Sequence, residues 1–128
     1  MGNQVEKIII VQRHQENLNS IREMVAENLP SCLSIMTFFT SPEDALRAAA
    51  GSNKKTIVIS GNVFEETNLD GDWFAREFKA NMSDVKVYCY SVCPSGGEHW
   101  DGLIVKEQGT CATGDHASLI EFLRAGLK

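Results

Sequence analysis

The chain has 128 residues, of which 43% are hydrophobic, and its formal net charge is −5 at pH 7. This length suits a single domain over residues 1–128 with an ordinary hydrophobic core. The acidic balance and the lack of a basic stripe exclude a nucleic-acid interface, and no apolar run is long enough to span a membrane. No signal-peptide core precedes the first apolar run, so we expect a cytoplasmic protein.

Four apolar, β-branched segments end abruptly in polar residues: 7–14, 56–62, 85–92 and 101–107. Such runs are typical of strands that are buried on both faces, with carboxyl ends that emerge into a cleft. In open parallel sheets, ligands bind at that cleft. The polar residues at the four ends are Gln12, Arg13, Ser60, Asn62, Ser91 and Lys106.

Helical patterns alternate with these strands along the chain. Residues 17–28 carry apolar side chains at helical spacing, and a second strand is expected at 33–39. Ser41 followed by Pro42 has the pattern of a helix start, and that helix is expected to stop at Gly51. An acidic loop at 65–72 then leads to a helix around 73–80, and a last helix follows Asp115. This alternation predicts an α/β fold with a doubly wound parallel sheet.

The strand ends, together with the Leu-Asp-Gly turn at 69–71, resemble the active site of the response-regulator receiver domain, and the resemblance covers residues 6–127. In that family the first strand ends in two carboxylates that hold Mg²⁺. The third ends in the phosphoacceptor aspartate, the fourth in Ser or Thr, and the fifth in Lys. Ser91 and Lys106 match, whereas Gln12 and Arg13 replace the acidic pair and Ser60 replaces the phosphoacceptor. The resemblance implies a flavodoxin-like sheet of five strands in the order 2-1-3-4-5.

The crossover between the fourth and fifth strands is short. It contains Pro94, Gly96 and Gly97, which make a poor helix, so we expect the fourth helix to be missing or reduced and 93–101 to be irregular. Three residues before the lysine, where the family has the aromatic residue that reports the switch, this chain has Leu103. The resemblance therefore implies that both the phosphorylation trigger and the responding surface are absent.

The degenerate pocket carries the functional prediction. Arg13 and Lys106 would repel a divalent cation, so we expect no Mg²⁺, no other cofactor and no enzymatic activity. We expect the cleft to bind a small anion weakly, unless an acid of the 65–72 loop neutralises Arg13. The expected function is that of a non-catalytic pseudo-receiver, which binds protein partners of a two-component-type pathway independently of phosphorylation. The exposed faces of the first and last helices are candidate surfaces for docking or homodimerisation.

Two alternatives from other classes stay open. In the first, the chain is a phosphorelay receiver phosphorylated at an atypical residue, either Ser60, with His14 as the nearest base, or an acid of the 65–72 loop. In the second, Cys93, His99 and Cys111 form a redox or metal module, although their spacing matches neither a zinc ribbon nor thioredoxin.

Overall fold

The molecule is built on a parallel sheet, as the alternating segments predict. The computed structural model describes residues 5–12, 15–50, 54–60, 63–64, 69–82, 84–91, 101–105 and 117–126. The strands of the sheet are β1 (Lys7–Val11), β2 (Met36–Phe39), β3 (Thr56–Ser60), β6 (Val85–Ser91) and β7 (Gly102–Val105). All neighbours are parallel, in the order β2-β1-β3-β6-β7. This confirms the predicted flavodoxin-like order 2-1-3-4-5.

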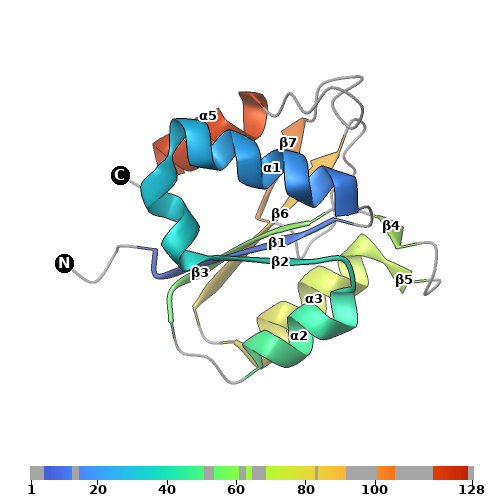
Figure 1. The fold of residues 1–128 in the computed structure, drawn as a ribbon. Coiled ribbons are helices and arrows are strands. Elements are labelled where there is room, and N and C mark those ends of the chain that lie inside the picture. Colours follow the sequence, from blue (N-terminus) through green and yellow to red (C-terminus); the bar gives the residue numbers. More distant parts are fainter. Residues whose placement is uncertain are drawn as a thin grey trace.

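Helices cover both faces of the sheet (Figure 1). Helices α1 (Gln15–Asn28) and α5 (Ala117–Gly126) lie on one face, and α2 (Pro42–Ala49) and α3 (Gly71–Asn81) lie on the other. A helix therefore follows each of β1, β2, β3 and β7, as predicted. None of these helices, which lie in the described part of the chain, is long and apolar enough to cross a lipid bilayer.

The apolar runs form two cores, one on each side of the sheet. Strand β1 is buried on both faces, because Ile8, Ile9, Ile10 and Val11 are all 0% exposed. Ile8 and Ile10 pack with the apolar face of α1 and with α5, whereas Ile9 and Val11 pack with α2 and α3. Burying an aliphatic side chain of this size stabilises the fold by roughly 1.5–3 kcal/mol. The β1 side chains therefore stabilise the packing of helices on both faces of the sheet.

The segment before β2 corrects the sequence prediction. A strand over 33–39 was expected, but residues Pro30–Ile35 form a 3₁₀ helix, η1, and the strand begins only at Met36. Pro30 lies in the first turn of η1, where its missing N–H leaves no donor unpaired. The Met36 N–H donates to the Leu33 carbonyl and closes the turn. The proline therefore favours a helical turn over the first half of the apolar run.

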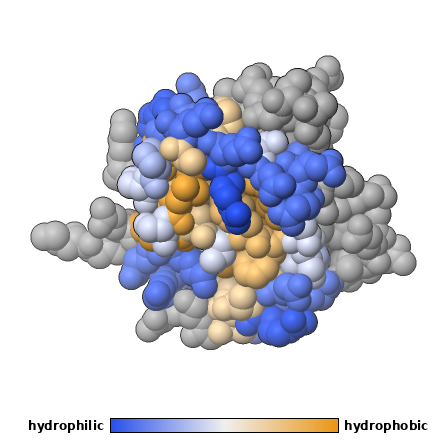
Figure 2. All heavy atoms as spheres, in the orientation of Figure 1, coloured by the Kyte–Doolittle hydropathy of each residue, from blue (hydrophilic) through white to orange (hydrophobic). Residues whose placement is uncertain are grey.

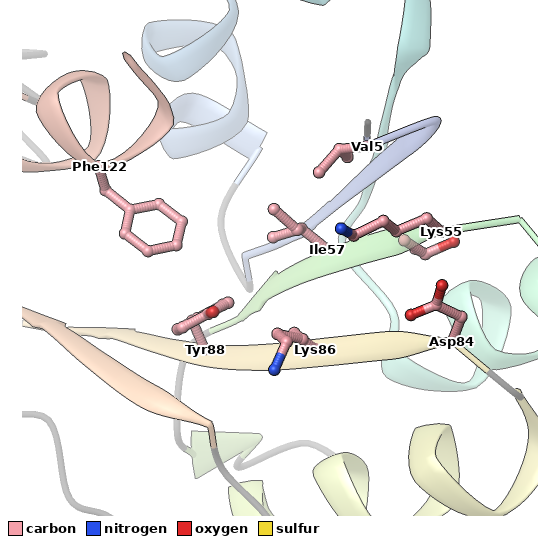
Figure 3. Close-up of a pocket in the computed structure, with 8 residues that line it drawn as sticks. Val5, Lys55, Ile57, Asp84, Lys86, Tyr88 and Phe122 are labelled. Atoms are coloured by element: carbon pink, nitrogen blue, oxygen red, sulfur yellow. The ribbon is translucent and has the colours of Figure 1, made fainter. Parts of the chain in front are cut away.

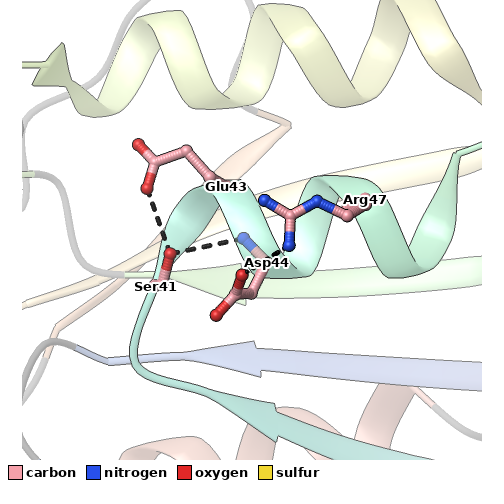
Figure 4. A network of polar contacts seen from close by, with 4 residues as sticks. All are labelled: Ser41, Glu43, Asp44 and Arg47. Carbon is pink, nitrogen blue, oxygen red and sulfur yellow. Dashed lines mark hydrogen bonds and ion pairs between the residues drawn. The ribbon is translucent and has the colours of Figure 1, made fainter.

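Helix α2 begins as its sequence predicts (Figure 4). Ser41 has extended backbone angles, and its Oγ accepts a hydrogen bond from the Asp44 N–H at 3.3 Å. The same hydroxyl donates to Glu43 Oε2 at 3.0 Å, and Arg47 pairs with Asp44 at 2.9 Å across one turn. Pro42 occupies the first turn, so this end of the helix has few unpaired donors.

Within the described residues, two short strands at the predicted acidic loop pair with each other. Strands β4 (Val63–Phe64) and β5 (Leu69–Asp70) pair antiparallel, and α3 starts at Gly71, two residues earlier than predicted. Aspartate is a favoured residue type before a helix, which accounts for the earlier start. The expected irregular crossover at 93–100, the Asp115 cap and the expected helix stop at Gly51 lie outside the described residues.

Hydrogen bonds and an ion pair of Asp101, the residue before β7, connect the start of this strand to β6 and α3. The Asp101 carboxylate accepts a hydrogen bond from the Val87 N–H at 2.7 Å and pairs with Lys79 Nζ of α3 at 2.6 Å. The Asp101 N–H donates to the Val87 carbonyl at 2.7 Å. Next in the chain, Gly102 lies under the Tyr88 ring, where a Cβ would come within 3.0 Å of two ring carbons. Asp101 and Gly102 thus set where the fifth strand begins.

Candidate functional site

The carboxyl ends of the parallel strands lie along one edge of the sheet, which we call the carboxyl edge. Gln12 follows β1 there, and its side chain is only 4% exposed. The Gln12 N–H donates to the Phe39 carbonyl at the end of β2, at 3.1 Å. This bond continues the β1–β2 ladder by one residue, so Gln12 is held at the carboxyl edge as the sequence predicts.

Ser60 and Ser91 end their strands at different depths. Ser60 pairs in register with Val11 on one side and with Cys89 on the other, so it lies two residues below Ser91. At about 3.3 Å of rise per residue, this stagger is about 7 Å along the strands. Ser60 is 0% exposed, so its hydroxyl is buried in the edge and is not offered to solvent. A small ligand bound at the surface of this edge would therefore not contact the Ser60 hydroxyl.

The structure describes only part of the remaining predicted pocket. Arg13, Asn62 and Lys106 lie outside the described residues, and for Ser91 only the backbone is described. Lys106 follows the last residue of β7, Val105, which pairs in register with Ser91. The atypical phosphoacceptors at 65–68, His14, and the proposed redox residues Cys93, His99 and Cys111 also lie outside the described part.

A further polar residue near this edge escaped the sequence analysis. Asn17 lies in the first turn of α1, which starts beside the carboxyl edge (Figure 1), and it is 4% exposed. Its Oδ1 atom is buried and has no hydrogen-bond partner in the described part of the chain. The sequence signal was its position four residues before Ile21, on the border of the apolar helix face. An unpaired buried acceptor costs about 1–3 kcal/mol, so Asn17 lowers the stability of the fold by an amount of this order.

The donor atoms described at this edge do not fit a magnesium ion. Magnesium is bound in proteins through carboxylates, with water and phosphate oxygens completing the octahedron. At the ends of β1 and β3 the chain offers a neutral amide, Gln12, and a neutral hydroxyl, Ser60. Among the described residues there is no group of three or more His, Cys, Asp or Glu side chains that could hold a metal ion. No step of phosphoryl transfer is therefore assigned to these residues.

The described cysteines behave as core residues. Cys89 is 0% exposed in the middle of β6, as the sequence predicts, and Cys32 is 6% exposed in η1. Burial raises the pKa of the Cys32 thiol above its ordinary value. A buried thiol with a raised pKa has little reactive thiolate at neutral pH.

The side of the sheet formed by β2 is an open edge with apolar character. A groove along this edge is lined by Arg22, Leu33, Met36, Thr37, Phe38 and Phe39. The guanidinium carbon of Arg22 lies 4.5 Å from the centre of the Phe38 ring, in a cation–π contact. Figure 2 shows apolar surface in the middle of this face with hydrophilic side chains on both sides of it.

Within the described residues, no strand pairs with the outer side of β2. The Phe39 carbonyl faces β1, since it accepts the hydrogen bond of Gln12. Backbone groups of successive strand residues point to opposite sides, so those of Phe38 face outward.

Comparison with known proteins identifies the fold. No family model matches the chain, and no curated protein matches it. Among solved structures, it is similar to the response regulator receiver protein from Dyadobacter fermentans, with a TM-score of 0.67 and 12% sequence identity. The match covers 94% of this chain and 96% of that chain. The chain has a receiver-like fold. At 12% identity the similarity shows the fold alone, so the role of each residue must be argued from this chain's own side chains.

Proposed function

We propose that this chain is a non-catalytic receiver-like signalling module, which acts by binding protein partners independently of phosphorylation, in a two-component-type pathway. The observation that carries the proposal is the pair Gln12 and Ser60 at the carboxyl ends of β1 and β3. In the receiver family that the sequence resembles, phosphoryl transfer takes place at the carboxyl ends of the strands, and Gln12 and Ser60 lack the carboxylates that it needs.

Phosphoryl transfer requires an in-line nucleophile and a cation that neutralises the charge developing on the transferred group. A neutral amide and a neutral hydroxyl attract no magnesium ion. A serine hydroxyl becomes a nucleophile only beside a general base. The full burial of Ser60 adds to this argument, because a phosphodonor would have to reach the hydroxyl inside the fold. A role through binding alone needs neither a metal nor a nucleophile.

The proposal includes the charge at the carboxyl edge. Lys106 directly follows β7, at the position where the family also has its lysine, and Arg13 stands where the family has one of its two metal-binding carboxylates. We propose that this edge holds a small anion weakly through charge-assisted hydrogen bonds. Isothermal titration with inorganic phosphate, on the full chain and on Lys106→Gln, tests this part. Equal heats from both proteins would contradict it.

The main test is phosphorylation by a small donor. The full chain is incubated with acetyl phosphate and Mg²⁺, and the intact mass is measured. We expect no phosphoryl adduct on the wild type or on Ser60→Ala. The double variant Arg13→Asp with Ser60→Asp, which restores two carboxylates, is expected to bind Mg²⁺ more tightly than the wild type. A stoichiometric adduct on the wild type that disappears in Ser60→Ala would favour the atypical phosphoreceiver instead.

A second measurement addresses partner binding. The full chain is used as bait in the presence and absence of acetyl phosphate, and the recovered proteins are quantified by mass spectrometry. The proposal predicts the same yield of each specific partner under both conditions. A several-fold rise in yield on adding the donor would mean that the chain responds to phosphorylation.

A further inference from the structure

The amino edge of the sheet, opposite the edge discussed above, contains a cavity of about 190 Å³ between β3, β6 and α5. We call it the amino-edge cavity. Its apolar lining is formed by Val5, Ile57, Tyr88 and Phe122. The Tyr88 and Phe122 rings meet edge to face, with centroids 4.6 Å apart, and form an aromatic wall (Figure 3). A dry cavity of about 150 Å³ in another protein binds benzene, so this one is large enough for a substituted aromatic ring.

The cavity exists because α5 leaves the amino end of β6 uncovered. Lys86, Tyr88 and Tyr90 alternate onto the face that carries α5, and their burial rises along the strand. Lys86 is exposed, Tyr88 is half-buried, and Tyr90 is only 1% exposed. On the opposite face, Val85 and Val87 are both buried under α3. A lysine in an otherwise apolar interior strand therefore marks an opening above the sheet.

The charged side chains that line this opening have a positive balance. Two lysines, Lys55 and Lys86, and one acid, Asp84, line the cavity. In Figure 3, Lys55 extends along the sheet toward Ile57, on the same side as the Asp84 carboxylate. An apolar lining together with lysine side chains suits a ligand with an apolar body and one negative charge. An aromatic body can add edge-to-face contacts with Phe122 and Tyr88.

We propose that the amino-edge cavity is a binding site for a small aromatic monocarboxylate, with its ring against Phe122 and Tyr88 and its carboxylate at Lys86. The lysine side chain is a mobile point charge on a long stem, so it can follow the carboxylate of ligands of somewhat different length. The site lies at the opposite edge of the sheet from Gln12 and Ser60 and does not depend on the proposed signalling role.

The experiment is a titration of the ¹⁵N-labelled full chain, followed by amide chemical shifts, with three probes of similar shape. Phenylacetate is the anion, 2-phenylethanol is the neutral probe, and 2-phenylethylamine is the cation. For a ligand of this size we expect phenylacetate to saturate with a Kd of about 1 mM. The largest shifts should fall at 55–57, 84–88 and 122. The alcohol should bind at least about five-fold more weakly, because it makes no charge-assisted contact, and the amine more weakly still.

Variants then test the role of the lysine. Lys86→Gln should weaken phenylacetate about five-fold and leave the alcohol unchanged, and Lys86→Glu should make the amine the better ligand. The matched control is Lys54→Gln, an exposed lysine that does not line the cavity. Both lysines are exposed, so these substitutions leave the folded core intact. Equal binding of the acid and the amine, equal losses in Lys86→Gln and Lys54→Gln, or shifts at other residues would each overturn the proposal.

Discussion

Asp101 is the side chain whose removal should test the structure most directly. Its carboxylate satisfies the Val87 N–H at 2.7 Å and pairs with Lys79 at 2.6 Å, and the Asp101 and Lys79 side chains are 23% and 33% exposed. Val87 is 0% exposed, and in Asp101→Ala its N–H loses its acceptor. The pairing of β6 with β7 begins only at Tyr88 and Gly102, so β7 offers no replacement. Leaving a buried donor unpaired costs about 1–3 kcal/mol, and a partly exposed ion pair contributes up to about 1 kcal/mol.

The expected loss for Asp101→Ala is therefore about 2–3 kcal/mol of unfolding free energy. It is measured by urea denaturation, in which a loss of this size lowers the midpoint by about 1 M or more. Asp101→Asn keeps an acceptor for the Val87 N–H and loses only the charge, so it should cost about 1 kcal/mol. A matched control is Arg47→Ala, which breaks the exposed pair with Asp44 and should cost less than about 0.5 kcal/mol.

Hydrogen exchange gives a local readout that a general loss of stability would not mimic. The Val87 amide should exchange much faster in Asp101→Ala than in Asp101→Asn, compared with other amides of β6. If Asp101→Ala and Asp101→Asn were equally stable, or if Val87 kept its protection in the alanine variant, the Asp101 side chain would not be the acceptor and the reasoning would be refuted.

Three further predictions concern other parts of the fold. Ser41→Ala should lower the unfolding free energy by about 1 kcal/mol in urea melts while Ser41→Thr keeps most of it, and equal melts of both variants would show that the cap is not formed. Gly102→Ala should cost about 1–3 kcal/mol because its Cβ meets the Tyr88 ring, and a Tyr88→Val background should remove most of that cost; strict additivity would argue against the contact. Burial and the nearby Asp101 charge raise the pKa of Tyr88 above its ordinary 10.0, so the unfolded phenol ionises first and stability should fall as pH rises above that value. The fall should be smaller in Tyr88→Phe, and identical pH profiles of wild type and variant would contradict the assignment.

The sheet was largely predictable from the sequence because its strands are buried on both faces. The run at residues 8–11 is apolar at every position, which neither a surface strand nor a surface helix requires. Helix α2 was predictable because Ser41 and Pro42 are chemical signals that act within one turn. The 3₁₀ helix η1 was not predicted, since Leu33 and Ile35 continue the apolar run of β2 and only Pro30 indicates a turn. The β4–β5 hairpin has strands of two residues each, too short for a periodic pattern.

The candidate sites divide in the same way. Gln12 and Ser60 were placed correctly at the carboxyl edge, since residues that end parallel strands must lie at one edge. The burial of Ser60 and the unpaired acceptor of Asn17 depend on how side chains of distant segments pack, which a pattern along one segment does not encode. The amino-edge cavity had a signal in the sequence, Lys86 within an apolar interior strand, but its depth depends on where α5 ends over the sheet.

The open side of the sheet at β2 has a consequence for the protein in concentrated solution. The outward backbone groups of Phe38 would accept a strand of another molecule, and two such edges meeting would extend the sheet from one molecule into the next. The Arg22 guanidinium over the Phe38 ring brings a positive charge to every approach of two like edges. Added salt weakens the repulsion between these charges. The protein should therefore begin to associate at a lower concentration in high salt than in low salt. The Arg22 side chain is thus placed to oppose the extension of the sheet from one molecule into the next.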